Sequence, residues 1–152
     1  MPETAPVERI YTSLYRHSVD EKRRIPIPFR WRPEESVEFS VIIWKKYEAG
    51  ICLRVLPPDQ WAKLRASVDD MPDENRNKAV LKRRIGTSSI QTKLDKAGRL
   101  TITEEMALAA GITNQAVLAG MINRFEIWSP ERYAIVEATD DAVLAQAMEK
   151  ME

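Results

Sequence analysis

The sequence is short of the residues that most often carry catalysis and cross-linking. Its 152 residues include one cysteine, Cys52, and one histidine, His17. A single cysteine excludes an internal disulfide, and its place in the apolar run 51–56 predicts a small core residue rather than a reactive thiol. No His/Cys cluster has metal-ligand spacing, so neither a metal nor a cofactor is expected.

Long apolar runs and Gly-rich phosphate loops are also missing. The longest apolar candidate, residues 39–44, has the length of a strand and not the roughly 20 residues of a membrane helix. Residues 1–6 lack the basic and hydrophobic character of a signal sequence, so a cytoplasmic protein is expected. The carboxylate pairs at 34–35 and 69–70 are adjacent in sequence rather than convergent. We therefore expect no enzyme, no membrane contact and no small-molecule substrate.

A pentad, Asp-x-x-x-Arg, is present twice, at residues 20–24 and 95–99. In both places an apolar residue precedes the aspartate, a lysine lies inside the pentad and alternating aliphatic residues follow the arginine. No other aspartate in the sequence has an arginine at the same downstream spacing. A second set of matches, at a slightly smaller offset, relates residues 53–61 to 125–133. The pattern indicates an internal duplication, with a longer connection between residues 34 and 49 in the first copy.

Each copy is predicted to contain a strand, the pentad loop, a second strand, a strand pair and a helix. Alternation predicts strands after each pentad, and turn signals separate two strand pairs. These strands are expected at 24–27 and 99–102, at 41–44 and 51–55 around Ala49-Gly50, and at 117–121 and 125–128 around Asn123-Arg124.

Proline, capping and glycine signals predict the helices. They are expected from Pro58, from about 73 to 85 with a stop at Gly86, at 104–110 with closure by Gly111, and from Pro130. A separate amphipathic tail helix is expected over 139–152, with an apolar side made by Val143, Leu144, Ala147, Met148 and Met151.

The net charge is zero, with 23 basic and 23 acidic side chains, but the charges are segregated. Residues 16–32 carry six Lys/Arg against two acids, and residues 76–99 carry eight against one. The tail 131–152 holds six acids against two bases. A charge run by itself is usually a solvated face, but both basic runs contain a pentad. That coincidence favours an anion-binding surface.

The pentad chemistry suits such a surface. An aspartate can accept hydrogen bonds from backbone N–H groups and freeze a loop, and can orient the arginine at the end of the pentad. The rest of the guanidinium can then reach a phosphate or a guanine edge. Gly98 suits a positive φ, which Arg23 in the first copy adopts less readily. The alternative is that aspartate and arginine only staple a hairpin turn.

These motifs resemble the MraZ family, bacterial transcriptional regulators built from two tandem repeats of the swapped-hairpin AbrB type. The resemblance covers residues 11–136 and rests on both pentads, Lys96-Ala97-Gly98-Arg99, Ala110-Gly111-Ile112 with Gly120, and residues 123–128. The chain departs from the family pattern at five positions. Tyr11 and Ser13 replace Phe and Gly, Arg23 replaces a glycine, Thr103 replaces a proline, and Ala107 stands where arginine is common.

The resemblance implies an α+β, mainly β fold, a pseudo-dimeric double swapped-hairpin barrel with short helices linking and flanking the repeats. The implied segments are a disordered extension at 1–10, repeat 1 at 11–60, linking helices at 61–88, repeat 2 at 89–132 and a helical tail at 133–152.

The implied function is a sequence-specific DNA-binding transcriptional regulator of the division and cell-wall gene cluster. It would be a nucleoid-associated ring of identical subunits that binds short direct repeats of double-stranded DNA in its own promoter region. Arg24 and Arg99 are expected to read or clamp DNA. The expected site also includes Asp20, Asp95, Lys22, Lys96, Arg23 and Arg16, and a protonated His17 is expected to contact an anion. The alternative is a protein-interaction module or ring scaffold whose basic loops contact an acidic protein.

Overall fold

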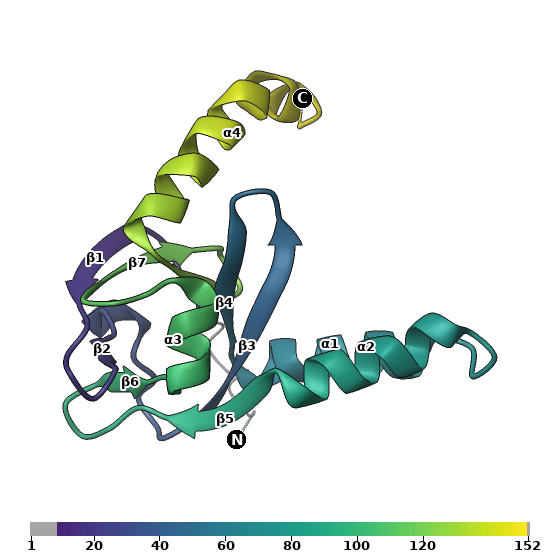
Figure 1. Cartoon of the computed structure of the whole chain (residues 1–152), viewed down its shortest axis with the longest axis horizontal. Coiled ribbons are helices and arrows are strands. Elements are labelled where there is room, and N and C mark those ends of the chain that lie inside the picture. The colour runs from purple at the N-terminus through teal and green to yellow at the C-terminus, as the bar shows by residue number, and fades with distance from the viewer. Residues whose placement is uncertain (1–8, 152) are drawn as a thin grey trace, which may run out of the picture.

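The computed structural model describes residues 9–151 and gives this range an α+β fold (Figure 1). The expected disorder of residues 1–10 lies outside the described range except for Arg9 and Ile10. The strands are β1 (Leu14–Ser18), β2 (Arg24–Pro26), β3 (Glu38–Tyr47), β4 (Gly50–Leu56), β5 (Ser89–Lys93), β6 (Arg99–Thr101), β7 (Gln115–Gly120) and β8 (Phe125–Trp128). The helices are α1 (Pro58–Asp69), α2 (Arg76–Thr87), α3 (Glu104–Ala110), α4 (Pro130–Glu149) and a 3-10 turn, η1 (Phe29–Trp31).

The strands form two antiparallel sheets. Six of them make one sheet in the order β1-β7-β8-β4-β3-β5, and β2 pairs with β6 as a separate ribbon. Both strand pairs that the turn signals predicted are confirmed as the hairpins β3–β4 and β7–β8. The strands predicted after the pentads are confirmed as β2 and β6, which pair with each other.

One apolar core joins both copies of the repeat. Ile25 and Leu100 are opposite each other at the centre of the ribbon, and both are fully buried. They pack in one cluster with an aromatic group in which the Trp31 and Phe125 rings are 4.8 Å apart and the Tyr11 and Phe125 rings 5.5 Å apart. Full burial of one such side chain is worth about 1.5–3 kcal/mol. Since the two copies share these contacts, each depends on the other for its buried surface.

The strand registers locate the length difference between the copies. Val55 and Ile127 are equivalent positions, and they pair with Val41 and Leu118 respectively. More residues separate Val41 from Val55 than separate Leu118 from Ile127. The spacing from each hairpin to the helix that follows it is the same in both copies. The extra length of the first copy therefore lies in the β3–β4 hairpin, which extends beyond the sheet (Figure 1). The longer connection that was expected between residues 34 and 49 therefore lies in the second half of that range.

A buried polar cluster holds this hairpin against β8. Arg54 and Glu126 are opposite each other across β4 and β8, with Nη2 and Oε2 3.8 Å apart. The Tyr47 hydroxyl accepts from Arg54 Nη2 and donates to Glu126 Oε2, both at 2.8 Å. Nε1 of Trp128 donates to Glu126 Oε1 at 3.0 Å. Buried charges need such partners, so these contacts satisfy Glu126 and define the position of Tyr47.

Cys52 is fully buried beside Trp128, which confirms it as a core residue. Burial raises the pKa of its thiol, which keeps the sulfur protonated and unreactive.

The helix predictions are partly confirmed. Helix α1 begins at Pro58, and α3 ends at Gly111 with φ +68°, as predicted. Two helix predictions were wrong: the stop at Gly86 and the break between the helix from Pro130 and the tail helix. Helix α2 begins after Asn75 and continues through Gly86, because this glycine is in ordinary helical geometry and not in the left-handed conformation that ends helices.

The short helix at Pro130 and the tail helix from residue 139 are one continuous helix, α4. No proline or glycine interrupts residues 131–149, so nothing in the backbone requires a break. The α1–α2 hairpin and α4 project from the body as two arms (Figure 1). No helix within residues 9–151 combines the length and the apolar character needed to cross a membrane.

Two glycines should respond oppositely to alanine. A Cβ on Gly86 would meet no atom within 4 Å, so Gly86→Ala should raise the free energy of unfolding by about 0.5–1 kcal/mol, because alanine favours helix. A Cβ on Gly120 would lie 2.5 Å from the backbone oxygen of Tyr11, so Gly120→Ala should lower that free energy by about 1–3 kcal/mol. Urea unfolding measures both, and equal effects would contradict this packing.

Candidate nucleic-acid interface

Asp20 holds the first pentad loop, between β1 and β2, in a fixed shape. Its Oδ1 accepts hydrogen bonds from the backbone N–H groups of Lys22 and Arg24, both at 2.9 Å. Its Oδ2 accepts from Nε of Arg24 at 2.6 Å. The backbone N–H of Asp20 also donates to the carbonyl of Arg24 at 3.1 Å. One carboxylate thus sets both the turn and the direction of the arginine.

Asp95 makes the same set of bonds in the second loop, between β5 and β6. Its Oδ1 accepts from the backbone N–H groups of Ala97 at 3.0 Å and Arg99 at 2.9 Å. Its Oδ2 accepts from Nε of Arg99 at 2.9 Å. The predicted action of each aspartate on its own loop and arginine is therefore confirmed in both copies.

Both loops need a left-handed residue just before the arginine. Gly98 has φ +78° and Arg23, its counterpart, has φ +61°. Glycine adopts this conformation freely, whereas an arginine there carries a steric cost. The prediction that Gly98 takes a positive φ is confirmed, and Arg23 takes the same left-handed conformation in the first loop. Ser13 also has a positive φ, of 86°.

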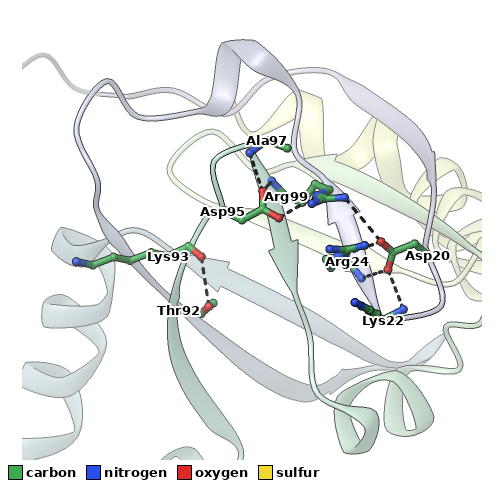
Figure 2. Close-up of polar contacts among 8 residues, drawn as sticks. All are labelled: Asp20, Lys22, Arg24, Thr92, Lys93, Asp95, Ala97 and Arg99. Atoms are coloured by element: carbon green, nitrogen blue, oxygen red, sulfur yellow. Dashed lines mark hydrogen bonds and ion pairs between the residues drawn. The ribbon is translucent and has the colours of Figure 1, made fainter.

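The pairing of β2 with β6 brings the two pentads side by side (Figure 2). Arg24 and Arg99 lie between Asp20 and Asp95, and Nη1 of Arg99 is 4.0 Å from Oδ2 of Asp20. About a third of each arginine side chain is exposed: 30% for Arg24 and 33% for Arg99. Lys22 and Lys96 lie on the loops themselves, and both are exposed. Seven of the eight predicted site residues therefore lie on these two neighbouring loops, and we call the surface that they form the pentad face: Asp20, Lys22, Arg23, Arg24, Asp95, Lys96 and Arg99.

Arg16 and His17 do not join the pentad face through any contact among residues 9–151. The Arg16 guanidinium is 4.0 Å from Glu137 of α4, and both side chains are about half exposed. The His17 ring stacks on Tyr15 at 6.2 Å, and its Nε2 is buried without a hydrogen-bond partner in the described range. Nε2 is therefore closed to an anion, and an anion contact of His17 through its other ring nitrogen stays a prediction.

Arg32 is a residue of this surface that sequence reasoning missed. Its guanidinium lies against Gly98, and its Nε donates to the carbonyl of Ile27 at 2.8 Å. No pentad contains Arg32, and the basic run 16–32 was the only signal that included it. Among residues 9–151, no group of three His, Cys, Asp or Glu side chains is placed to hold a metal ion.

The hydrogen bonds lower the pKa of both pentad aspartates. The largest cause is the backbone N–H of Arg24 for Asp20 and of Arg99 for Asp95, followed by opposing desolvation and by the arginine side chains. Ionised carboxylates therefore stabilise the loops above the ordinary pKa of 3.8, and this contribution is lost as the pH falls through the lower folded-state pKa.

A carbon-detected NMR titration of the two carboxyl groups should show this shift directly. Both should titrate below their pKa in the urea-unfolded chain, and Arg24→Ala should raise only the pKa of Asp20. A folded-state value at or above the unfolded one, in either loop, would contradict the described hydrogen bonding.

The sequence is similar to known proteins along most of its length. Residues 87–151 match the family model described as "MraZ protein, putative antitoxin-like". A "Transcriptional regulator MraZ" of Roseiflexus castenholzii is 31% identical over 133 residues, which cover 88% of this chain and 90% of the relative. A protein of the same name from Herpetosiphon aurantiacus is 32% identical over 84% of this chain and 86% of its own length.

A third relative of that name, from Halothermothrix orenii, is 28% identical over 93% of this chain and 99% of its own length. These names describe regulators and not enzymes, in agreement with the prediction from the missing catalytic residues. The resemblance seen in the motifs is confirmed across both repeats, and the chain belongs to the MraZ family.

Proposed function

We propose that this protein is a DNA-binding transcriptional regulator and that the pentad face contacts DNA. The observation that carries the proposal is the pairing of β2 with β6, which places two aspartate-oriented arginines side by side on one exposed face. The names of the relatives support the same function. A protein with this function would lie in the cytoplasm, associated with the nucleoid.

The chemistry of the pentad face fits nucleic acid. Each pentad arginine binds its own aspartate through Nε, and Nη1 of Arg99 also lies 4.0 Å from Oδ2 of Asp20. Within residues 9–151 no terminal amino group of either arginine makes a hydrogen bond, so these groups can bind a phosphate or the O6 and N7 atoms of guanine. Lys22 and Lys96 add point charges for the DNA backbone. Because the aspartates fix the loops beforehand, little conformational entropy remains to be lost on binding.

We also propose that the fold is a double swapped-hairpin barrel. Strand β1 of the first copy pairs with β7 of the second, and β5 of the second pairs with β3 of the first, as exchanged hairpins require. The proposed units remain repeat 1 at 11–60, linking helices at 61–88, repeat 2 at 89–132 and a tail at 133–152. The last boundary crosses α4, so the tail continues a helix of repeat 2.

Arg24→Ala combined with Arg99→Ala should abolish operator binding. Each arginine is expected to contribute about 1–3 kcal/mol through base or phosphate contacts. Electrophoretic mobility shift with DNA from upstream of the protein's own gene measures the loss, and gel filtration should show an unchanged oligomer. Arg76→Ala, at the tip of the α1–α2 arm, is the matched control for one lost charge and should bind normally. Unchanged binding by the double variant would refute the role of the pentads.

The salt dependence separates DNA from an acidic protein partner. Affinity for DNA should fall steeply as salt rises, because neutralised phosphates release counterions, and the double variant should reduce the slope by about two. A wild-type protein that ignores the DNA fragment but captures an acidic protein through the pentad face would favour the interaction-module alternative.

We propose further that identical subunits assemble into a ring that binds short direct repeats. Helix α4 exposes an apolar side that includes Val143, Leu144 and Met148, each more than half exposed. An apolar groove on the other arm, between α1 and α2, is lined by Trp61, Leu64, Val68 and Ile85. If α4 of one subunit binds the groove of the next, each contact joins two different surfaces and is head to tail. Such contacts can close a ring, in which every subunit presents its pentad face in the same direction.

Leu144→Asp should prevent this assembly, because a carboxylate would be buried in an apolar groove. Light scattering with size-exclusion chromatography should then find a smaller species with an unchanged circular dichroism spectrum. Gln146→Asp places the same charge on the opposite side of α4 and should leave the oligomer intact. If both variants assemble like the wild type, α4 does not form the contact.

The proposed target is the protein's own promoter region, upstream of division and cell-wall genes. Several subunits of a ring can bind successive repeats, so weak contacts at each pentad face would combine into high affinity. Footprinting over that region is the direct test of the target, and protection spaced by a constant repeat is the expected pattern.

A further inference from the structure

We propose that Arg32 gives the second pentad loop the guanidinium that Arg23 gives the first, so that both loops present matched cationic groups to DNA. This inference rests on the proposed function of the pentad face. It adds to that face a residue that lies outside both pentads.

In the first loop, Arg23 occupies the left-handed position and points across to the other copy. Its Nε donates to the carbonyl oxygen of Ile102 at 3.2 Å. The backbone N–H of Ile102 also donates to the Arg23 carbonyl at 3.0 Å. The Arg23 guanidinium is therefore tied to the residue that follows β6, and its side chain is partly buried.

In the second loop, the equivalent position is Gly98, which has no side chain. Its carbonyl accepts from the backbone N–H of Ile27 at 3.0 Å, which repeats the backbone contact of the first loop. The missing guanidinium is supplied by Arg32, whose Nε donates to the carbonyl of Ile27 at 2.8 Å. Ile27 and Ile102 are equivalent positions, because each follows its pentad arginine at the same spacing.

Glycine at position 98 is what admits Arg32. A Cβ there would collide with the Arg32 guanidinium carbon and Nε. One loop therefore carries its third guanidinium within the pentad, and the other accepts it from the segment after η1. The sequences of the loops differ at this position, yet the same kind of group donates to the same kind of carbonyl in both.

Both guanidiniums keep donors for a ligand. Within residues 9–151, the hydrogen bonds of Arg23 and Arg32 side chains use Nε alone, and neither side chain forms an ion pair. A guanidinium held through Nε retains its two terminal amino groups, which match the oxygens of a phosphate. Both arginine residues are partly exposed, so a phosphate can approach them.

Arg32 is held in place before any ligand binds. The preceding residue, Trp31, is fully buried and donates from Nε1 to the carbonyl of Thr12 at 2.9 Å. The backbone N–H of Arg32 donates to the carbonyl of Phe29 at 3.0 Å, which closes η1. A fixed backbone and a bonded Nε leave little freedom to lose on binding.

The surroundings make Arg32 more important than its single charge suggests. The hollow beside the second loop is lined by Arg32 and Lys96, but also by Glu34, Glu35 and Asp95. Asp95 is already bound by Arg99, so Arg32 and Lys96 face the two remaining acids of this lining. Loss of Arg32 would leave Lys96 as the remaining base beside them and would make the hollow more negative. Arg32 keeps the second loop suitable for DNA.

The test compares full-length Arg32→Ala, Arg32→Lys and Arg23→Ala with the wild type, using the upstream DNA fragment over a range of salt concentrations. Arg32→Ala and Arg23→Ala should each weaken binding roughly tenfold and lower the slope of log Kd against log salt by about one. Arg32→Lys should keep the slope but lose affinity, because lysine cannot bind Ile27 and a phosphate in the same way. Arg76→Ala should change neither quantity by a comparable amount.

Three outcomes would overturn the inference. An unchanged slope and affinity for Arg32→Ala, with binding lost in the double pentad variant, would reject Arg32 alone and leave the proposed function standing. A loss of affinity with an unchanged slope, accompanied by a lower melting temperature, would make Arg32 a purely structural residue. No DNA binding by the wild type would overturn both proposals.

Discussion

Every strand within residues 9–151 has a partner in the other copy of the repeat, and the rest of the structure depends on that exchange. Strand β1 pairs with β7, β2 with β6, β3 with β5 and β4 with β8. The ribbon has only three residues in each strand, so its stability comes from Ile25 and Leu100 packing into the shared core rather than from its hydrogen bonds alone. The same ribbon sets the distance between the two pentads. Core packing and the composition of the exposed face are thus consequences of one arrangement.

The pentad aspartates show how a small charged motif can be precise without being buried. Each carboxylate is partly solvated, so its ion pair with arginine is screened and worth little by itself. Its value lies in geometry, because three donors converge on two oxygens and fix both the backbone and the arginine. The stapling role is thus shown by these bonds, and it is compatible with the proposed binding role. The staple is what orients the guanidinium.

Local signals in the sequence predicted much of this. The spacing of Asp and Arg predicted the loop bonds, and Gly98, Gly111 and Pro130 marked a turn, a helix end and a helix start. The failures concern facts that no local pattern contains. Gly86 looked like a stop, but helix geometry tolerates glycine at a modest cost in the absence of a left-handed turn.

Features that depend on distant parts of the chain were also missed. Arg32 and Gly98 are far apart in the sequence, and only the folded pairing of the repeats brings them together. The enclosure of His17 likewise depends on how β1 packs.

The fusion of two repeats into one chain has a consequence for how such a surface can change. In a dimer of identical short chains, an arginine at the left-handed position would appear in both loops, and its Cβ would exclude Arg32 from each. Here the two positions mutate independently, so one loop carries the strain of Arg23 at φ +61° while the other retains a relaxed glycine. Covalent duplication thus separates symmetry of charge from symmetry of sequence, and a future change in one loop can alter half of the surface without touching the other.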